Sequence, residues 1–547
     1  MAAGPTAAAA AASLSRPPSS RFALTSRASF LSPVTALLAL AVALAGCASL
    51  PPPPPKPASS AATDTADTAL GRLAAASLAG APPGASGFRL LPTGDYAFDA
   101  RVALARRAER TLDVQYYQIA ADSVGLQLLR SLRDAARRGV RVRVLVDDLY
   151  TGGEDELFAT FAALPNVELR LFNPFATREP GVATRVLQSL PDFGRINHRM
   201  HNKLFVADNR FSVSGGRNMA DEYFMRSAHA NFIDMDVLAA GQIVREQSQV
   251  FDRYWNSSLA WPIGDVVKLP IVGDAAARRF DELVSAAPPG FAPATSDVLG
   301  RPSVDFELAA GRASLVFAPA VVFADRPNKA EVTESAKDAA TVTRSVIEEL
   351  TTARSQILIT SPYFIPGEPG IENMRQAIAR GVRISVLTNG VGATDEPLVH
   401  FRYARYRRQM LRLGVELNEI GPAAADPATF GDFGQSYRRL HAKVAVIDLK
   451  KVFIGSMNFD ARSAWSNTEA GLLIDSPELA VTLHELVSRD HGETIYRLRL
   501  RADGETIEWT WRGADGTLQA TTDEPHSSWA LRLKMFVLEP FAAEELL

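Results

Sequence analysis

"HNKLFVADNRFSVSGGRN", residues 201–218, sets a histidine and a lysine two residues apart, an aspartate five residues further on, and then Gly-Gly-Arg-Asn. A second stretch, "HAKVAVIDLKKVFIGSMN" at residues 441–458, repeats this spacing and ends in Gly-Ser-Met-Asn. A feature that occurs twice with the same internal spacing indicates that the chain contains a repeat.

The sequence around these stretches repeats as well. A strand, an amphipathic helix and a second strand are predicted in each half, and Arg-Gly-Val closes the helix in both. The predicted elements are residues 110–118, 125–139 and 140–148 in the first half, and 354–364, 371–381 and 382–390 in the second. Alternating strands and helices predict a duplicated α/β domain with a mostly parallel or mixed sheet flanked by helices.

The overall composition limits the functional classes. A chain of 547 residues with 47% hydrophobic residues predicts two domains with additional segments. Its net charge of -3 disfavours a protein that coats nucleic acid with a basic surface, although a local basic cleft stays open. Lysine is scarce, with nine residues among 58 basic ones, and two of the nine are Lys203 and Lys443. The repeated motif therefore contains lysine, with its compact ammonium group, in a chain whose basic residues are mostly arginine.

The N-terminal region has the layout of an export signal. Arginines precede an apolar run that ends in Leu-Ala-Gly-Cys at Cys47, the only cysteine of the chain. The small residues before Cys47 resemble a bacterial lipoprotein box, which implies lipidation of Cys47. The alternative is a plain signal peptide or an uncleaved membrane helix. Residues 48–86 are rich in proline and alanine, and we expect them to form a linker that is first stiff and then flexible.

The spacing of the motif suits phosphoryl transfer. Residues two apart on a strand face the same side, so His201 would project with Lys203, and His441 with Lys443. One imidazole can attack phosphorus, the ammonium groups can neutralise its oxygens, and the second imidazole can protonate the leaving group. We expect the glycines of each motif to clear space for a phosphate, which Asn218 and Asn458 would bind. Asp208 and Asp448 are expected at turns or in ion pairs.

Both stretches match HxKx4Dx6G(G/S)xN, and on this motif the chain resembles the phospholipase D superfamily. The resemblance covers about residues 87–490. It implies two tandem α/β/α sandwich domains with pseudo-twofold symmetry and one active site at their interface. It also implies that His201 is the nucleophile, which becomes phosphohistidine, that His441 is the general acid and base, and that neither a metal nor a cofactor is needed.

The resemblance assigns the remaining site residues. Lys203, Lys443, Asn218, Asn458 and Ser456 would hold the phosphate. Glu469 and Asp234 would orient the histidines. Rivals for the place of Asp234 are Asp236, Asp221 and Glu222.

Further stretches, among them "SPYFIPG" at 361–367 and "FDRYWNS" at 251–257, resemble bacterial cardiolipin synthases of the C-type branch. This implies transfer of a phosphatidyl group onto phosphatidylglycerol, with phosphatidylethanolamine as a possible donor, at a membrane surface and without nucleic acid. The alternatives are hydrolysis to phosphatidic acid, a phosphodiesterase acting on nucleic acid, and a non-catalytic scaffold. We expect an exported, lipid-anchored protein that faces the periplasm, with the inner or outer membrane left open.

Other segments carry weaker signals. Asp147 and Asp148 could line the site or cap a helix, residues 400–412 could meet anionic head groups or form a solvated helix face, and His198 is expected to be peripheral. The expected organisation is a signal peptide (1–46), a lipidated cysteine with its linker (47–86), a first domain (87–268), a connecting segment (269–331), a second domain (332–495), and a hairpin and helix (496–547).

Overall fold

A computed structural model describes residues 50, 52–189, 192–269, 271–285, 295–331, 341–422, 437–489, 495–513 and 515–538. The described residues all belong to one compact unit, Ala48–Leu547. The predicted signal peptide and Cys47 lie outside the described residues, so both stay predictions.

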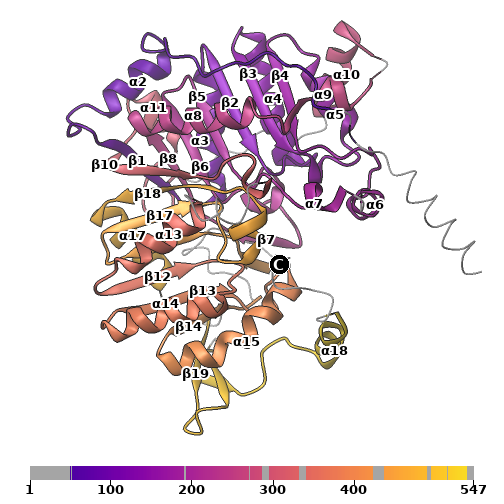
Figure 1. Cartoon of the computed structure of the whole chain (residues 1–547). Coiled ribbons are helices and arrows are strands. Elements are labelled where there is room, and N and C mark those ends of the chain that lie inside the picture. Colours follow the sequence, from indigo (N-terminus) through magenta and orange to yellow (C-terminus); the bar gives the residue numbers. More distant parts are fainter. Residues whose placement is uncertain are drawn as a thin grey trace, which may run out of the picture. The chain divides into compact units, whose positions relative to one another are not determined.

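The first half forms a nine-stranded mixed sheet (Figure 1). Its strand order is β10-β1-β8-β6-β5-β2-β3-β4-β9, in which β2, β3 and β4 are mutually parallel and the other pairs are antiparallel. The strands are β1 (Ser86–Leu91), β2 (Thr111–Tyr116), β3 (Arg141–Asp147), β4 (Val167–Phe172), β5 (Leu204–Ala207), β6 (Phe211–Gly215), β8 (Asp236–Ala240), β9 (Ala260–Pro262) and β10 (Val316–Ala318).

The second half forms a ten-stranded sheet with the order β11-β18-β17-β16-β12-β13-β14-β19-β20-β21. Here β12, β13 and β14 are parallel. The strands are β11 (Ala320–Ala324), β12 (Gln356–Thr360), β13 (Arg383–Asn389), β14 (Glu416–Ile420), β16 (Val444–Ile447), β17 (Lys451–Gly455), β18 (Ala470–Asp475), β19 (Ile495–Leu500), β20 (Ile507–Arg512) and β21 (Leu518–Thr521).

The two sheets share one topology. Without the edge strands β10, β20 and β21, the order β1-β8-β6-β5-β2-β3-β4-β9 of the first sheet matches β11-β18-β17-β16-β12-β13-β14-β19 of the second, strand for strand. The predicted fold class, two tandem α/β domains that repeat one another, is therefore confirmed. A small parallel pair, β7 (Ala230–Ile233) with β15 (Tyr437–Leu440), joins the halves.

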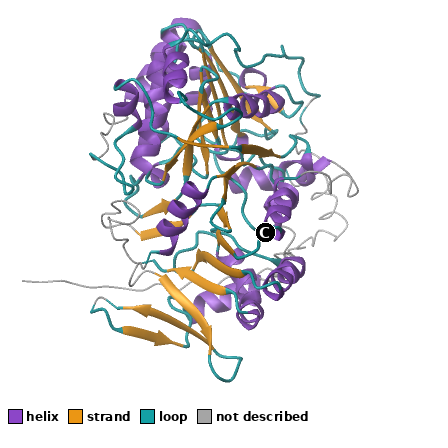
Figure 2. Cartoon of the chain, turned by 90° about the vertical axis from the view of Figure 1, so that its left-hand side faces the viewer, coloured by secondary structure: helices purple, strands orange, loops and turns teal. Residues whose placement is uncertain are grey.

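Helices cover the sheets, and a shared core lies between them. Figure 2 shows the strands of the first half between helices. The inner faces of both sheets, with α8 and α17, contribute to a single hydrophobic core, whereas the outer face of each sheet has a core of its own. The principal helices are α3 (Gly94–Arg107), α4 (Ser123–Arg137), α5 (Asp155–Ala162), α8 (Gln242–Trp255), α13 (Val342–Thr351), α14 (Gly367–Ala379), α15 (Pro397–Leu413) and α17 (Pro477–Ser488).

Shorter elements connect these layers. The segment expected to connect the domains supplies one edge strand to each sheet, β10 and β11. The tail contains the antiparallel pair β20-β21 and a final helix. The shorter helices are η1 (Asp148–Tyr150), α6 (Val182–Gln188), α7 (Phe193–Ile196), η3 (Asp221–Phe224), α9 (Ile263–Val266), α10 (Gly273–Ser285), α11 (Val304–Ala309), η4 (Lys329–Glu331), the π-helix η5 (Arg462–Ser466) and α18 (Trp529–Leu538).

The prediction of a flexible linker up to residue 86 is wrong from Lys56 onward. Lys56 Nζ donates to the carbonyl oxygens of Ser257 and Ala260, both at 2.5 Å, and Trp255 Nε1 donates to Ser59 Oγ at 2.9 Å. The chain then forms helix α2 (Ala69–Ser77), which buries Leu70 in the core. Composition did not reveal this, because many of these contacts use backbone groups of the segment, which every residue carries, and all of them depend on partners far away in the sequence.

Asp208 and Asp448 each fix the turn that follows a motif strand. Both have positive φ, at 49° and 54°, a conformation that aspartate tolerates better than most residues. The Asp208 carboxylate accepts hydrogen bonds from the backbone N–H groups of residues 109–111, and Asp448 accepts those of residues 354–356. Each aspartate therefore ties the β5-β6 or β16-β17 turn to the start of the central strand.

Replacing these aspartates should destabilise the fold unequally. Asp208 is fully buried and Asp448 is only half-buried, so Asp208→Ala should lower the free energy of unfolding by about 3 kcal/mol and Asp448→Ala by about 1 to 2 kcal/mol. Urea denaturation followed by circular dichroism measures both. The Asp→Asn variants keep the turn conformation and should lose less. Equal losses for the two alanine variants would contradict this account.

Candidate active site

The four motif side chains lie just ahead of their strands. His201 and Lys203 precede β5, and His441 and Lys443 precede β16, so the expectation that they sit within a strand is wrong. The backbone N–H of His201 instead donates to Thr468 O at 2.9 Å, and that of His441 to Ile233 O at 2.8 Å. These bonds cross from one half to the other, which takes each histidine out of its own sheet. All four side chains are buried.

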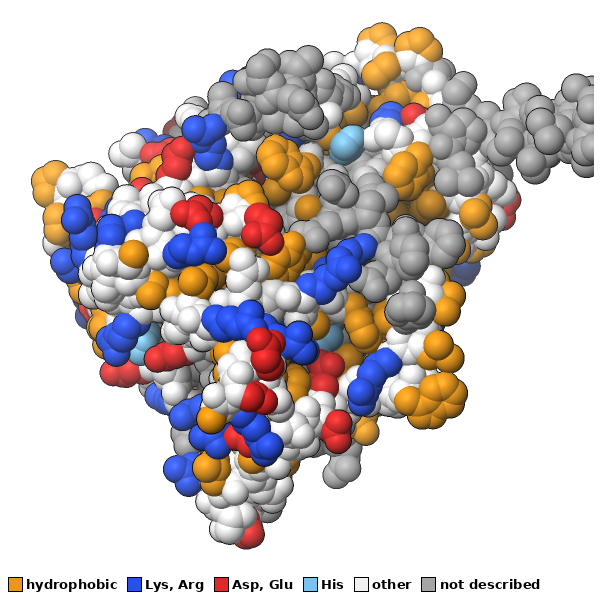
Figure 3. Space-filling view, turned by 60° about the horizontal axis from the view of Figure 1, so that its bottom comes forward, with side chains coloured by type: hydrophobic (Ala, Val, Ile, Leu, Met, Phe, Trp, Pro, Cys, Tyr) orange, Lys and Arg blue, Asp and Glu red, His pale blue; other side chains and the backbone are white. Residues whose placement is uncertain are grey.

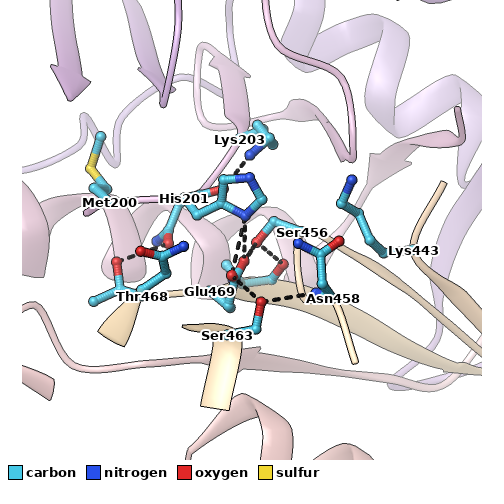
Figure 4. A network of polar contacts seen from close by, with 12 residues as sticks. Met200, His201, Lys203, Lys443, Ser456, Asn458, Ser463, Thr468 and Glu469 are labelled. Atoms are coloured by element: carbon cyan, nitrogen blue, oxygen red, sulfur yellow. Dashed lines mark hydrogen bonds and ion pairs between the residues drawn. The ribbon is translucent and has the colours of Figure 1, made fainter. Parts of the chain in front are cut away.

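Each histidine is paired with a carboxylate of the opposite half. His201 Nδ1 lies 3.1 and 3.0 Å from the two carboxylate oxygens of Glu469 (Figure 4). His441 Nδ1 lies 2.7 Å from Asp234 Oδ2. The crossed pairs place both histidines in one site at the junction of the halves. In each pair the carboxylate can fix the imidazole tautomer and leave Nε2 free for chemistry.

The structure separates Asp234 from its rivals. Asp236 forms an ion pair with Arg101 at 2.9 Å, and Asp221 accepts the backbone N–H of Val124 at 2.8 Å. Glu222 lies in η3, and no contact with either histidine is seen. Asp234 alone among these four carboxylates contacts a motif histidine.

Two serine hydroxyls hold Glu469. Ser456 Oγ donates to Glu469 Oε2, and Ser463 Oγ donates to Oε1 at 2.9 Å (Figure 4). The Ser456 hydroxyl thus holds the carboxylate in this structure, and its contact with a phosphate stays a prediction. Ser463 was not predicted at all. Its one sequence signal is its place in the repeat, where it stands 240 residues after Tyr223.

The glycines of the first motif make room for the chain that carries Asp234. A Cβ on Gly216 would lie 2.1 Å from Asp234 Oδ1, and one on Gly215 would lie 2.3 Å from Met235 O. Both distances are far shorter than a real contact. These glycines therefore accommodate the carboxylate and its backbone, where the sequence had suggested room for a phosphate.

Aromatic rings and two asparagines complete the site. Tyr117 packs edge-on against His201 with centroids 5.0 Å apart, and Tyr223 against His441 at 4.9 Å. Asn218 Nδ2 donates to the Tyr223 hydroxyl at 2.9 Å. The amide oxygens of Asn218 and Asn458 are buried without a hydrogen-bond partner at equivalent positions of the two halves. Such matched, unsatisfied groups are typical of a binding site. Neither tyrosine was predicted, since both lie outside the motif.

Burial and the lysines keep both imidazoles neutral. Burial, reinforced by Lys203, lowers the pKa of His201 to about 4 although Glu469 opposes this, and burial with Lys443 lowers that of His441 to about 3. Burial also lowers the pKa of Lys443 to about 8 and that of Lys203 well below its usual value. At neutral pH the site thus offers unprotonated imidazoles beside two amines. Such a site can attract an anion and attack it.

The remaining predicted residues support the site from outside. Asp147 accepts the N–H of Met200 at 2.8 Å and that of Leu149 at 2.9 Å, so it anchors the residue before His201 and caps η1. Burial raises its pKa to about 6. Asp148 is buried in ion pairs with Arg178 and Arg185. His198 Nδ1 lies 3.2 Å from Ser466 O.

The basic stretch at residues 400–412 forms most of α15 and is partly consumed by internal pairs. His400 contacts Glu524 at 2.8 Å, and Arg407 contacts Glu419 at 2.7 Å. Both contacts are buried inside the second half. Two predictions were open for this helix, a solvated face and a site for anionic head groups. Neither describes it completely, because part of its basic side chains pair inside the protein.

Substitution of Ser456 should affect turnover more than binding. Ser456→Gly copies the residue of the first half at the equivalent position, and it should lower kcat about 10-fold to 100-fold because Glu469 loses a donor. KM should change little. Asn458→Ala, which removes a predicted phosphate contact, should instead raise KM. Steady-state kinetics with a chromogenic phosphodiester separate the two, and a raised KM with unchanged kcat for Ser456→Gly would contradict the role given to Ser456.

Anion binding should be coupled to proton uptake. Burial and the field of Lys443 lower the pKa of His441, and a phosphate or tungstate ion between the lysines cancels that field and adds a negative charge. The pKa of this imidazole should therefore rise, and binding should take up a measurable fraction of a proton at about pH 6.5. Calorimetric titrations in buffers of different ionisation enthalpy measure the uptake. His441→Ala should abolish it, and Asp448→Asn, which is remote, should not. Proton release, or the same uptake in His441→Ala, would contradict the assignment.

Comparisons with known proteins agree with this geometry. The model of the "Cardiolipin synthase, PLD-like domain" family matches residues 102–255 and 346–491. Cardiolipin synthase C of Escherichia coli K12 is 36% identical over 82% of this chain and 93% of its own length, and an uncharacterized protein of Helicobacter pylori 26695 is 30% identical over 82% and 88%. The crystal structure of phosphatidylserine synthase from Haemophilus influenzae has a similar fold, with a TM-score of 0.53, 12% identity, and coverage of 87% of this chain and 99% of that one. The chain belongs to the family of cardiolipin synthases with phospholipase D-like domains.

Proposed function

We propose that this enzyme transfers a phosphatidyl group from a donor phospholipid to a hydroxyl group of phosphatidylglycerol, which produces cardiolipin. The observation that carries the proposal is the pair of neutral, buried imidazoles, each held by a carboxylate of the other half and flanked by the two lysines. The names of the relatives support the lipid as substrate.

The site supports a reaction in two steps. His441 first takes up a proton when the phosphate binds between the lysines. His201 Nε2 then attacks phosphorus, the P–N bond forms, and the P–O bond to the donor head group breaks as His441 gives that oxygen this proton. His441 then takes the proton of the acceptor hydroxyl, whose oxygen attacks phosphorus and releases His201. Lys203 and Lys443 balance the charge on the phosphate oxygens in both steps. Water as acceptor would give phosphatidic acid by the same route.

Two alternatives receive less support. A nucleic acid substrate calls for a broad positive surface, whereas the face in Figure 3 mixes basic, acidic and apolar side chains and the net charge is -3. A non-catalytic scaffold would not need to keep His, Lys and a paired carboxylate in both halves. Each of these six groups is present and buried.

Attachment to a membrane through Cys47 remains part of the proposal, and the inner and outer membrane both stay open. Lys56, where the chain binds the body, lies nine positions after Cys47. Nine residues span at most about 30 Å, so lipidated Cys47 would keep the body close to the bilayer. Among the described residues, no helix is both long and apolar enough to cross a membrane.

Lipid mass spectrometry tests the reaction. Vesicles of phosphatidylglycerol, with and without phosphatidylethanolamine, are incubated with the protein or with His201→Ala. Cardiolipin should form with the unaltered protein, and His201→Ala should lower the rate at least about 1,000-fold, because it removes the nucleophile. An increase when phosphatidylethanolamine is present would identify it as a donor.

Three other results would reject the proposal. Phosphatidic acid without cardiolipin would make the enzyme a phospholipase. Cleavage of nucleic acid without turnover of lipid would make it a nuclease-type phosphodiesterase. Equal lipid profiles for the protein and His201→Ala would favour the scaffold.

A further inference from the structure

A large apolar pocket lies in the second half. Its volume is about 840 Å³, and residues of helices α13 and α14 and of strand β12 line it. Its walls are mainly apolar and include Ile347, Leu350, Ile359, Phe364, Met374 and Phe459. Protein interiors are close-packed, and ligand pockets commonly have this size, so a hollow of such volume calls for an explanation.

The chain segment that follows the second motif connects the pocket to the active site. Asp460, Ala461, Ala464 and Trp465 line the pocket and lie two to seven residues after Asn458. Ser463, within the same π-helix η5, holds Glu469. One segment of the chain thus forms a wall of the pocket and also holds Glu469, the carboxylate that pairs with His201. The Trp465 side chain is 47% exposed, so this wall reaches the protein surface.

The first half shows that the fold does not require the pocket. There, α3 packs directly against α4 and η3, the rings of Phe98 and Phe224 meet edge-on at 5.5 Å, and Leu128 is buried in the same hydrophobic core. The repeat shows which residues of the two halves occupy equivalent positions. Three features align the halves: the motifs, the Arg-Gly-Val after each helix, and the strand starts bound by Asp208 and Asp448. The equivalent residues are Thr343 for Phe98, Ala464 for Phe224 and Gly370 for Leu128, and all three line the pocket.

We infer that this pocket binds one acyl chain of the phospholipid whose phosphate occupies the active site. The inference rests on the proposed function and adds the site for the apolar part of the substrate. Three large apolar side chains of the first half are replaced by small residues at one place, next to the catalytic segment. The volume they vacate has an apolar wall and a polar rim with Thr341, Arg344 and Glu348, which suits a hydrocarbon chain with its ester end near water.

The length of the acyl chain provides the test. Phosphatidylglycerols with two four-, six- or eight-carbon chains are assayed below their micelle concentrations. For the unaltered protein, kcat/KM should rise by up to about fourfold per added methylene that enters the pocket, equivalent to about 0.8 kcal/mol. Ala464→Phe restores the aromatic ring of the first half and fills the pocket. It should abolish most of this rise.

Two further variants control for folding and for general effects. Ile347→Trp fills the pocket from the opposite wall and should give the same flat dependence. Ala162→Phe makes the same substitution as Ala464→Phe in a separate pocket of about 510 Å³ near Pro57, and it should keep the rise with chain length. An unchanged rise in both filled variants, or a lost rise in Ala162→Phe, would overturn the inference.

Photocrosslinking gives a readout that does not depend on turnover. Phosphatidylglycerol with a diazirine at the end of one acyl chain should label peptides of α13, α14 or η5 in His201→Ala, and the label should fall at least about tenfold when Ala464→Phe is added. Competition with phosphatidylglycerol but not with palmitate would show that the chain belongs to a phospholipid. Labelling without any cardiolipin formation would reject the proposed reaction and keep the acyl site, whereas labelling elsewhere would reject the acyl site.

Discussion

The crossed hydrogen bonds between the histidine of one half and the carboxylate of the other are the constraint on which the structure depends. Asp234 and Glu469 are fully buried, and their pKa values stay below the usual range despite burial because His441 and His201, with the lysines, stabilise the charges. A buried charge without its partner costs several kcal/mol. Each half supplies the carboxylate that pairs with the histidine of the other half. The site is therefore complete only when both halves are present.

The two halves keep the same topology and differ where the chemistry needs a difference. Asp234 is short and lies against Gly216, whereas the longer Glu469 is held by the hydroxyls of Ser456 and Ser463. The carboxylates that pair with the two histidines are therefore held by different contacts, although the two motifs are alike. The same divergence opens the pocket between α13 and α14, where the first half is filled by Phe98, Phe224 and Leu128. A symmetric fold thereby binds a substrate that has no such symmetry.

Much of this was predictable from local sequence. The two motifs identified the buried His and Lys residues, and the alternating pattern predicted the strand at 110–118 and the helix at 125–139, which are β2 and α4. The crossing of the carboxylates was not predictable, because it follows from the pairing of β7 with β15 and of Met200 with Thr468, far apart in sequence. The role of Ser456 and the binding of residues 56–65 depend on tertiary contacts in the same way. The pocket exists because the side chains at these positions are small, and no sequence motif marks such positions.

The most direct test of this account is the protonation pattern of the two imidazoles, read from the nitrogen chemical shifts of His201 and His441 in long-range ¹H–¹⁵N spectra. Glu469→Gln should change the Nδ1 signal of His201 and leave that of His441, and Asp234→Asn should do the reverse. This result would establish that each half orients the histidine of the other. If Asp234→Asn changed His201 and Glu469→Gln changed His441, each half would orient its own histidine, and the account of one interlocked site would be wrong.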